Sequence, residues 1–293
     1  MVTWRLFGES HGREIGIEVR GLAPFAYDAD MLRVFLSRRS RNAPRAEPDE
    51  LQVEWRGKTL RITIANVDQR PDDYATMRTV PRPGHADYAA FLKTGSIPLG
   101  GGKWSGRLTA PLCAAGGIAL QELARRGVSI RSRVMAKDCA GADDSFGGVV
   151  EVVAEGVPAG LGDAGGEGLE SKLAAALFGI PAAKGVEFGD GFALAAMKGS
   201  EANDPFVVRD GRVTLASNHC GGILGGVSIG APLVARVAFK PTPSIRIEQD
   251  SVDLSTMTNV RLRVRGRHDR CVAFRAAPVV EGVMALVLLG EMT

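Results

Sequence analysis

Cysteine is scarce in this chain of 293 residues, which holds only Cys113, Cys139, Cys220 and Cys271. No two of them form a Cys-x-x-Cys pair, so neither a structural zinc site nor a disulfide framework is expected. We predict no metal site, and widely spaced free thiols are typical of proteins in a reducing cytoplasm.

Long hydrophobic runs and a targeting segment are also lacking. Residues 1–8 do not combine a basic segment with an apolar run, so no signal peptide is predicted. The apolar run 276–289 is shorter than the roughly 20 residues that span a bilayer, and it contains Glu281. We therefore predict a buried C-terminal helix in a cytoplasmic protein with no membrane partner.

Neither sign of charge is in large excess, since 36 Lys and Arg face 33 Asp and Glu, a net charge of +3. The one basic cluster, residues 38–45, follows a predicted helix and has no interleaved aromatic residues. A nucleic-acid partner is therefore not predicted. The cluster is either a solvated helix end, where cations suit the helix dipole, or a binding site for a small anion.

Hydrophobic periodicity of both the strand and the helix type is abundant. Alternation predicts strands at residues 15–19, 51–55, 59–65, 128–134, 148–154, 192–197, 213–216, 227–229, 233–239, 245–247 and 260–264. Helices are predicted at residues 28–39, 107–126 and 168–178, and near the C-terminus. No linker or repeat divides the chain, so we predict one α+β domain over residues 1–293 with mostly antiparallel strands.

Histidine is rare as well, and every histidine lies in a glycine-containing loop: His11, His85, His219 and His268. In Gly8-Glu-Ser-His-Gly12 two glycines bracket three polar side chains, a pattern typical of groups presented to a ligand. Gly100-Gly-Gly102 precedes a predicted helix, as in an anion site, although a plain hinge has the same composition. Trp104 replaces the Ser or Thr that a phosphate-binding P-loop requires.

These motifs occur in an order that resembles the chorismate synthase family over nearly the whole chain. The stretches that carry the resemblance are Gly8-Glu-Ser-His-Gly12, Asn66-Val-Asp-Gln-Arg70, Arg82-Pro-Gly-His-Ala-Asp87, Ser105-Gly-Arg107, Gly156-Val-Pro-Ala-Gly-Leu-Gly162, Lys184-Gly-Val-Glu-Phe-Gly-Asp-Gly-Phe192, Ser217-Asn-His-Cys-Gly-Gly-Ile-Leu-Gly-Gly226, Lys240-Pro-Thr-Pro-Ser-Ile245 and Gly266-Arg-His-Asp269.

The resemblance implies a fold of helices sandwiched between two antiparallel β-sheets, assembled as a homotetramer. It also implies a reaction, the 1,4-elimination of phosphate from 5-enolpyruvylshikimate-3-phosphate to give chorismate. Reduced FMN is the implied cofactor, kept reduced by an external flavin reductant.

Catalytic roles follow by the same resemblance for His11, beside the flavin, for His85, at the departing phosphate, and for Asp269, near flavin N5. The substrate carries a phosphate and two carboxylates, which bidentate Arg side chains suit. The implied substrate-binding residues are Ser10, Arg39, Arg45, Arg107 and Arg267. The implied flavin-binding residues are Ser105, Ala182, Gly225, Lys240, Pro241, Thr242, Ser244 and Arg267. His219 and His268 are interpreted as local hydrogen-bonding groups that hold loops.

The chain departs from the family pattern at Trp104, Pro181 and Arg270, where the family has a small hydroxyl residue, Asn and Pro. The segments after Arg39 and between residues 134 and 144 are also shorter than usual, as is the C-terminus. Two hypotheses therefore stay open. The first is an active, compact chorismate synthase, and the second is an impaired paralogue that binds flavin or an anionic metabolite without the elimination.

Overall fold

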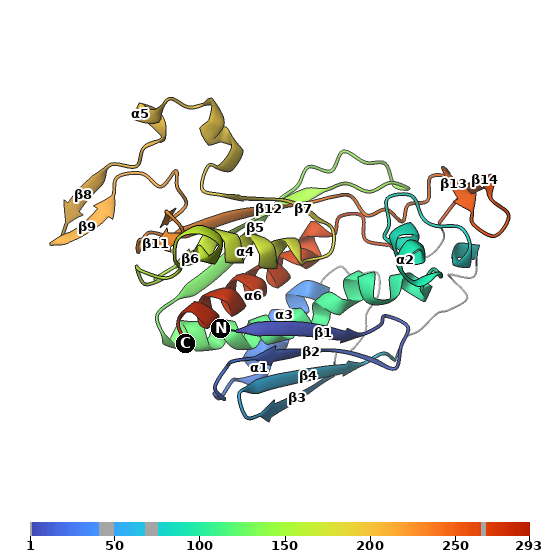
Figure 1. The fold of residues 1–293 in the computed structure, drawn as a ribbon, viewed down its shortest axis with the longest axis horizontal. Helices are drawn as coiled ribbons and strands as arrows, with labels where there is room; N and C mark the ends of the chain where they lie inside the picture. The colour runs from blue at the N-terminus through green and yellow to red at the C-terminus, as the bar shows by residue number, and fades with distance from the viewer. Residues whose placement is uncertain (1, 41–49, 68–75, 265–267) are drawn as a thin grey trace.

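Two four-stranded antiparallel sheets enclose a layer of helices in the computed structural model, which describes residues 2–40, 50–67, 76–264 and 268–293 (Figure 1). The first sheet has the order β1 (Thr3–Gly8), β2 (Glu14–Arg20), β4 (Thr59–Ala65), β3 (Leu51–Arg56). The second has the order β5 (Ser129–Met135), β6 (Gly148–Glu155), β12 (Leu233–Phe239), β7 (Ala183–Phe188). The predicted sandwich of helices between two antiparallel sheets is confirmed.

The helical layer consists of α1 (Ala29–Ser40), α3 (Thr109–Arg125), α4 (Leu169–Phe178) and α6 (Ala273–Glu291). Strand alternation turns one face of each sheet toward this layer: Ile15, Ile17 and Val19 of β2 are fully buried. Helices α3 and α6 cross at Gly116 and Gly282, where an added Cβ on Gly116 would lie 2.2 Å from Cα of Gly282. The missing side chains thus let the two central helices touch backbone to backbone.

Helix α6 is the predicted buried C-terminal helix. Within the described part of the chain it is the only helix long and apolar enough to suit a bilayer, yet 83% of its apolar window is buried inside the protein. Its Glu281 is 2% exposed. The carboxylate accepts hydrogen bonds from Nη1 and Nη2 of Arg38, both at 2.7 Å, and from the hydroxyl of Ser132 at 2.6 Å. This buried carboxylate in the apolar part of the helix is therefore fully hydrogen-bonded.

Smaller elements extend from the two ends of the sandwich. The hairpins β8 (Phe206–Arg209) with β9 (Arg212–Leu215), β10 (Ile223–Leu224) with β11 (Val227–Ser228), and β13 (Gln249–Asp253) with β14 (Thr258–Leu262) accompany the short helices α2 (Asp87–Thr94) and α5 (Gly199–Ala202). Residues 190–216, which we call the arm, project from the body and carry β8 and β9 (Figure 1).

Two predicted strands are wrong. Residues 192–197 lie mostly in the 3₁₀ turn Gly191–Ala196, because Gly189 and Gly191 adopt positive φ and turn the chain out of the sheet after β7. Residues 245–247 are irregular, since the amide of Arg246 bonds to the carbonyl of Asp143 rather than to a strand, and the hairpin starts at Gln249. Strands β1, β7, β8, β10 and β13 and helices α2 and α5 have no counterpart among the sequence predictions.

Candidate active site

A cavity of about 240 Å³ lies beside the first turns of α3 and α6. The sequence-predicted site residues that line it are Arg39, His85, Ala182, Lys240, Thr242, Ser244 and Asp269. Trp104, Ile180, Pro181, Val272 and Ala276 add an apolar wall. The fold thus brings the end of α1, the loop before α2, the loop after β12 and the start of α6 to one place.

His85 is held on the cavity wall by two buried charged residues, Arg82 before it in the sequence and Asp87 after it. Its Nδ1 lies 2.6 Å from Oδ1 of Asp87, a fully buried carboxylate that is also paired with Arg82. Burial lowers the pKa of His85, and the neighbouring Arg82 and Lys240 cations act in the same direction, against the opposing effect of Asp87. Burial favours neutral Asp87, but its bonds from Arg82 and His85 outweigh this and lower its pKa.

His11 and Ser10 lie against Gly100–Gly102, which we call the triglycine loop, rather than in the cavity lining. The hydroxyl of Ser10 bonds to the carbonyl of Gly100 at 3.2 Å, and an added Cβ on Gly100 would lie 2.2 Å from Cε1 of His11. One on Gly101 would lie 3.0 Å from Cε1 of His85. With positive φ as well, these positions require glycine, and the two histidines pack against adjacent residues of the loop.

The two predicted arginines within the described residues occupy different places. Arg39 is 4% exposed, lines the cavity, and donates to Oγ1 of Thr109 at 3.1 Å and to the carbonyl of Gly106 at 3.2 Å. Arg107 is 9% exposed and donates to Oδ1 of Asn66 at 3.3 Å, outside the cavity lining. Asn66 in turn donates to carbonyls of the loop that carries His11. Arg45 and Arg267 lie outside the described residues.

The carboxylate of Asp269 faces the cavity and pairs with Nη1 of Arg275 at 2.8 Å. Arg270, the extra cation beside it in the sequence, directs its guanidinium elsewhere: to Asp138 at 3.1 Å and to the carbonyl of Ala140 at 2.9 Å. The guanidinium of Arg270 therefore stabilises the shortened segment between β5 and β6 and is not directed at Asp269.

The remaining predicted flavin positions are divided between the cavity and its surroundings. Lys240 donates to the carbonyl of Gly84, and burial, followed by the nearby Lys184, lowers its pKa. Ala182 adopts a left-handed conformation with φ of 72°, and its carbonyl accepts from the amide of Lys240 at 3.1 Å. Three positions do not line the cavity: Ser105, whose hydroxyl accepts from the amide of Arg107, Pro241, which is exposed, and Gly225, in the β10–β11 turn.

His219 holds the base of the arm, as its interpretation as a loop-holding group requires. Its Nδ1 lies 2.6 Å from Asp190, whose hydrogen bond raises the pKa of His219. Its backbone amide donates to Asp204 at 2.8 Å. His268 lines a neighbouring cavity of about 300 Å³ that shares Asp269 and Ser244 with the first.

Sequence reasoning missed two groups that complete the site. Asp87 stands in the quoted Arg82–Asp87 motif, where its spacing of two from His85 was a usable signal. Arg275 had no such signal, because only the first turn of α6 brings it beside Asp269.

Fold and cavity together define an α+β protein with a cationic binding site that also carries an imidazole and a carboxylate, the groups used in acid–base catalysis. Comparisons give the family. The family model described as chorismate synthase matches residues 2–138 and 135–293. The chain belongs to the chorismate synthase family, whose members are lyases of the shikimate pathway.

Similar proteins support this membership over almost the full length. Chorismate synthases from Thermococcus gammatolerans and Methanosarcina mazei are 42% and 38% identical to this chain, covering 98% and 100% of it and 95% and 93% of their own lengths. A crystal structure of a chorismate synthase, 23% identical, covers 99% of this chain and 90% of its own with a TM-score of 0.73, which shows the shared fold.

Proposed function

We propose that this protein, as one domain over residues 1–293, converts 5-enolpyruvylshikimate-3-phosphate to chorismate and phosphate in the cytoplasm, with reduced FMN as cofactor. The observation that carries the proposal is the cavity in which His85 and Asp269 meet Arg39 and Lys240. An imidazole can give a proton to the leaving phosphate, and a carboxylate can assist removal of the substrate proton, the two proton transfers of the elimination. The cations suit a substrate with a phosphate and two carboxylates.

The residues present fit a flavin. Among the described residues, Oγ1 of Thr242 is a buried hydroxyl without a hydrogen-bond partner, and it lines the cavity beside Ser244. Trp104 and Pro181 offer apolar surface to a ring system, and Lys103 covers the indole ring from 4.6 Å. Trp104 also lines a second cavity, together with Lys103, so this residue borders both cavities.

Bound reduced FMN supplies transient electron density to the allylic system, and an external reductant keeps it reduced. The chain's own residues do the rest. Arg39 and Lys240 hold the anionic groups, and His85 gives a proton to the departing phosphate. Asp269 assists removal of the substrate proton, held in position by Arg275. His11 and Ser10 pack against the triglycine loop next to His85, and Ser105, which follows that loop, accepts from the amide of Arg107.

An anaerobic assay with reduced FMN and 5-enolpyruvylshikimate-3-phosphate tests this function. We expect equal amounts of phosphate and chorismate. Oxidised FMN gives a separate binding readout, because a flavin beside Trp104 quenches tryptophan fluorescence, and Trp104→Phe should remove that component. Quenching without phosphate release above the enzyme-free background would instead favour the binding-only paralogue. No quenching and no turnover would contradict the enzyme and the flavin-binding paralogue, and would leave only a paralogue that binds an anionic metabolite.

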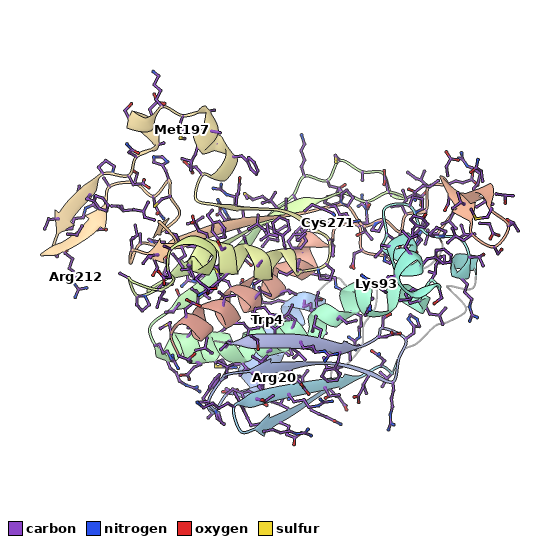
Figure 2. The ribbon with its side chains drawn as sticks, in the orientation of Figure 1. Trp4, Arg20, Lys93, Met197, Arg212 and Cys271 are labelled. Carbon is purple, nitrogen blue, oxygen red and sulfur yellow. The ribbon has the colours of Figure 1, made fainter. Side chains whose placement is uncertain are left out.

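We also propose a homotetramer in which a second copy of the chain covers the arm. The register of β8 and β9 places Phe206, Val208, Val213 and Leu215 on one face, and the first three are 65%, 74% and 69% exposed. Arg209 and Arg212 share the opposite face, and Figure 2 places Arg212 at the far end of the arm. A two-stranded ribbon with one apolar face is not stable alone.

The double substitution Val208→Asp and Val213→Asp is expected to dissociate the tetramer, because four protomers would each bury two carboxylates. Both side chains are exposed within the chain, so folding of the protomer should be little affected. Arg212→Asp, on the polar face, is the matched control. Light scattering on size-exclusion chromatography gives the masses. A tetrameric double variant, or a monomeric unmodified protein, would contradict the proposal.

A further inference from the structure

The carboxylate of Asp87 is fully buried and has four polar contacts, two at each oxygen. Oδ2 accepts from the backbone amide of Arg82 at 3.1 Å and from its Nε at 2.7 Å. Oδ1 accepts from Nη2 of Arg82 at 2.8 Å and faces Nδ1 of His85 at 2.6 Å. Two donors at each oxygen would fill the acceptor capacity of a carboxylate. Among the described residues, Asp87 is hydrogen-bonded to these two alone.

This geometry decides which nitrogen of neutral His85 carries the proton. Nδ1 also lies 3.0 Å from Nη2 of Arg82, which is a donor. If Nδ1 were bare, its lone pair would face Oδ1 of Asp87 at 2.6 Å with no proton between two acceptors. With the proton on Nδ1, His85 donates to Asp87, and Arg82 donates to the same oxygen. Only the second arrangement satisfies every group.

We propose that Asp87 is a positioning residue that holds His85 in its Nδ1-protonated tautomer and thereby presents Nε2 to the cavity. Arg82 takes part in this arrangement, since its guanidinium neutralises the buried carboxylate. Its Nη1 also donates to Ser244 at 3.2 Å, and Ser244 lines the cavity as well. Gly101 carries no side chain there, and an added Cβ would lie 3.0 Å from Cε1 and 3.4 Å from Nε2 of His85.

The inference rests on the proposed role of His85 in the elimination and specifies the proton that moves. Protonated His85 carries protons on both nitrogens. As the carbon–oxygen bond to phosphate breaks, the proton on Nε2 passes to the departing phosphate oxygen, and that oxygen keeps the bonding electron pair. His85 is left as the neutral Nδ1-protonated tautomer, and Asp87 remains ionised throughout. The groups that face the ring are Asp87, which favours its charged form, and Arg82 and Lys240, which oppose it.

Nitrogen NMR on protein labelled with ¹⁵N-histidine tests the tautomer directly. With only four histidines, single His→Gln variants assign every imidazole. At a pH above the titration of His85 we expect Nδ1 to bear the proton and Nε2 to be bare. The opposite tautomer, or an averaged mixture of the two, would overturn the proposal. This result does not depend on turnover, so it stands apart from success or failure of the proposed reaction.

Asp87→Asn tests the consequence for the reaction. The amide keeps the shape but cannot accept all four bonds, so we expect kcat to fall on the order of ten- to a hundredfold with little change in KM, the range known for carboxylates that orient metal-binding histidines. Loss of the carboxylate should also move the alkaline limb of the pH–kcat profile to lower pH, because Arg82 and Lys240 then act on His85 unopposed.

Asp250→Asn is the control, because that carboxylate is 86% exposed on the β13–β14 hairpin. A folded Asp87→Asn protein with unchanged kcat and pH profile would refute the positioning role. If the variant does not fold, the tautomer in the unmodified protein decides the question.

Discussion

Asp269→Asn is expected to lower kcat by roughly 10²- to 10⁴-fold, the usual range for loss of a proton-transfer group. The asparagine side chain has the same shape and still accepts a hydrogen bond from Arg275, so the start of α6 should keep its conformation. It cannot receive a proton. Anaerobic steady-state turnover gives kcat, and quenching of Trp104 fluorescence shows whether FMN binding persists.

The matched control for this experiment is Arg270→Gln, one residue further along the chain. The guanidinium of Arg270 bonds to Asp138 and Ala140 and lies over the ring of Phe146, 5.6 Å from its centroid. Its loss should leave kcat within a fewfold of the unmodified value. Asp269→Asn with full kcat would remove Asp269 from the mechanism, and a large loss with Arg270→Gln would give that cation a role that its contacts do not indicate.

The layers of the fold were predictable because they follow from local periodicity. Alternation in residues 59–65 matches β4, with Leu60, Ile62 and Ile64 buried on one face. The apolar segment near the C-terminus became α6. The wrong strands at residues 192–197 and 245–247 are also short and largely apolar, but within the part of the chain that the structure describes no strand pairs with them. Pairing is a long-range property that alternation does not contain.

The candidate site was predictable only in part, for a related reason. Motifs identified His85 and Asp269 individually, while the contact of Asp269 with Arg275 and the contact of His85 with the triglycine loop depend on how α6 and the 3₁₀ turn Leu99–Trp104 are placed. Spacing within a motif therefore indicates which groups matter. The partners of these groups come from segments that only the fold brings together.

Gly116→Ala is expected to destabilise the protein although alanine is the better helix former. The intrinsic propensity favours alanine by about 1 kcal/mol. The added Cβ, however, would lie 2.2 Å from Cα and 2.6 Å from C of Gly282, and backbone atoms cannot rotate away as a flexible side chain can. Overpacking of this kind costs about 1–3 kcal/mol or more, so the clash should win. Gly116→Val adds two further methyl groups and should leave little folded protein.

A shift of α3 away from α6 in Gly116→Ala should also change the geometry of the cavity. Helix α3 begins at Thr109 and α6 follows Val272, and both residues line the cavity. Urea denaturation measures the free energy of unfolding of Gly116→Ala, and the assay measures its kcat. Gly199→Ala is the control, since a Cβ there meets no atom within 4 Å. If Gly116→Ala were as stable as Gly199→Ala, α3 and α6 would have to move apart without cost, and their backbone contact would not be what holds the two walls of the cavity in register.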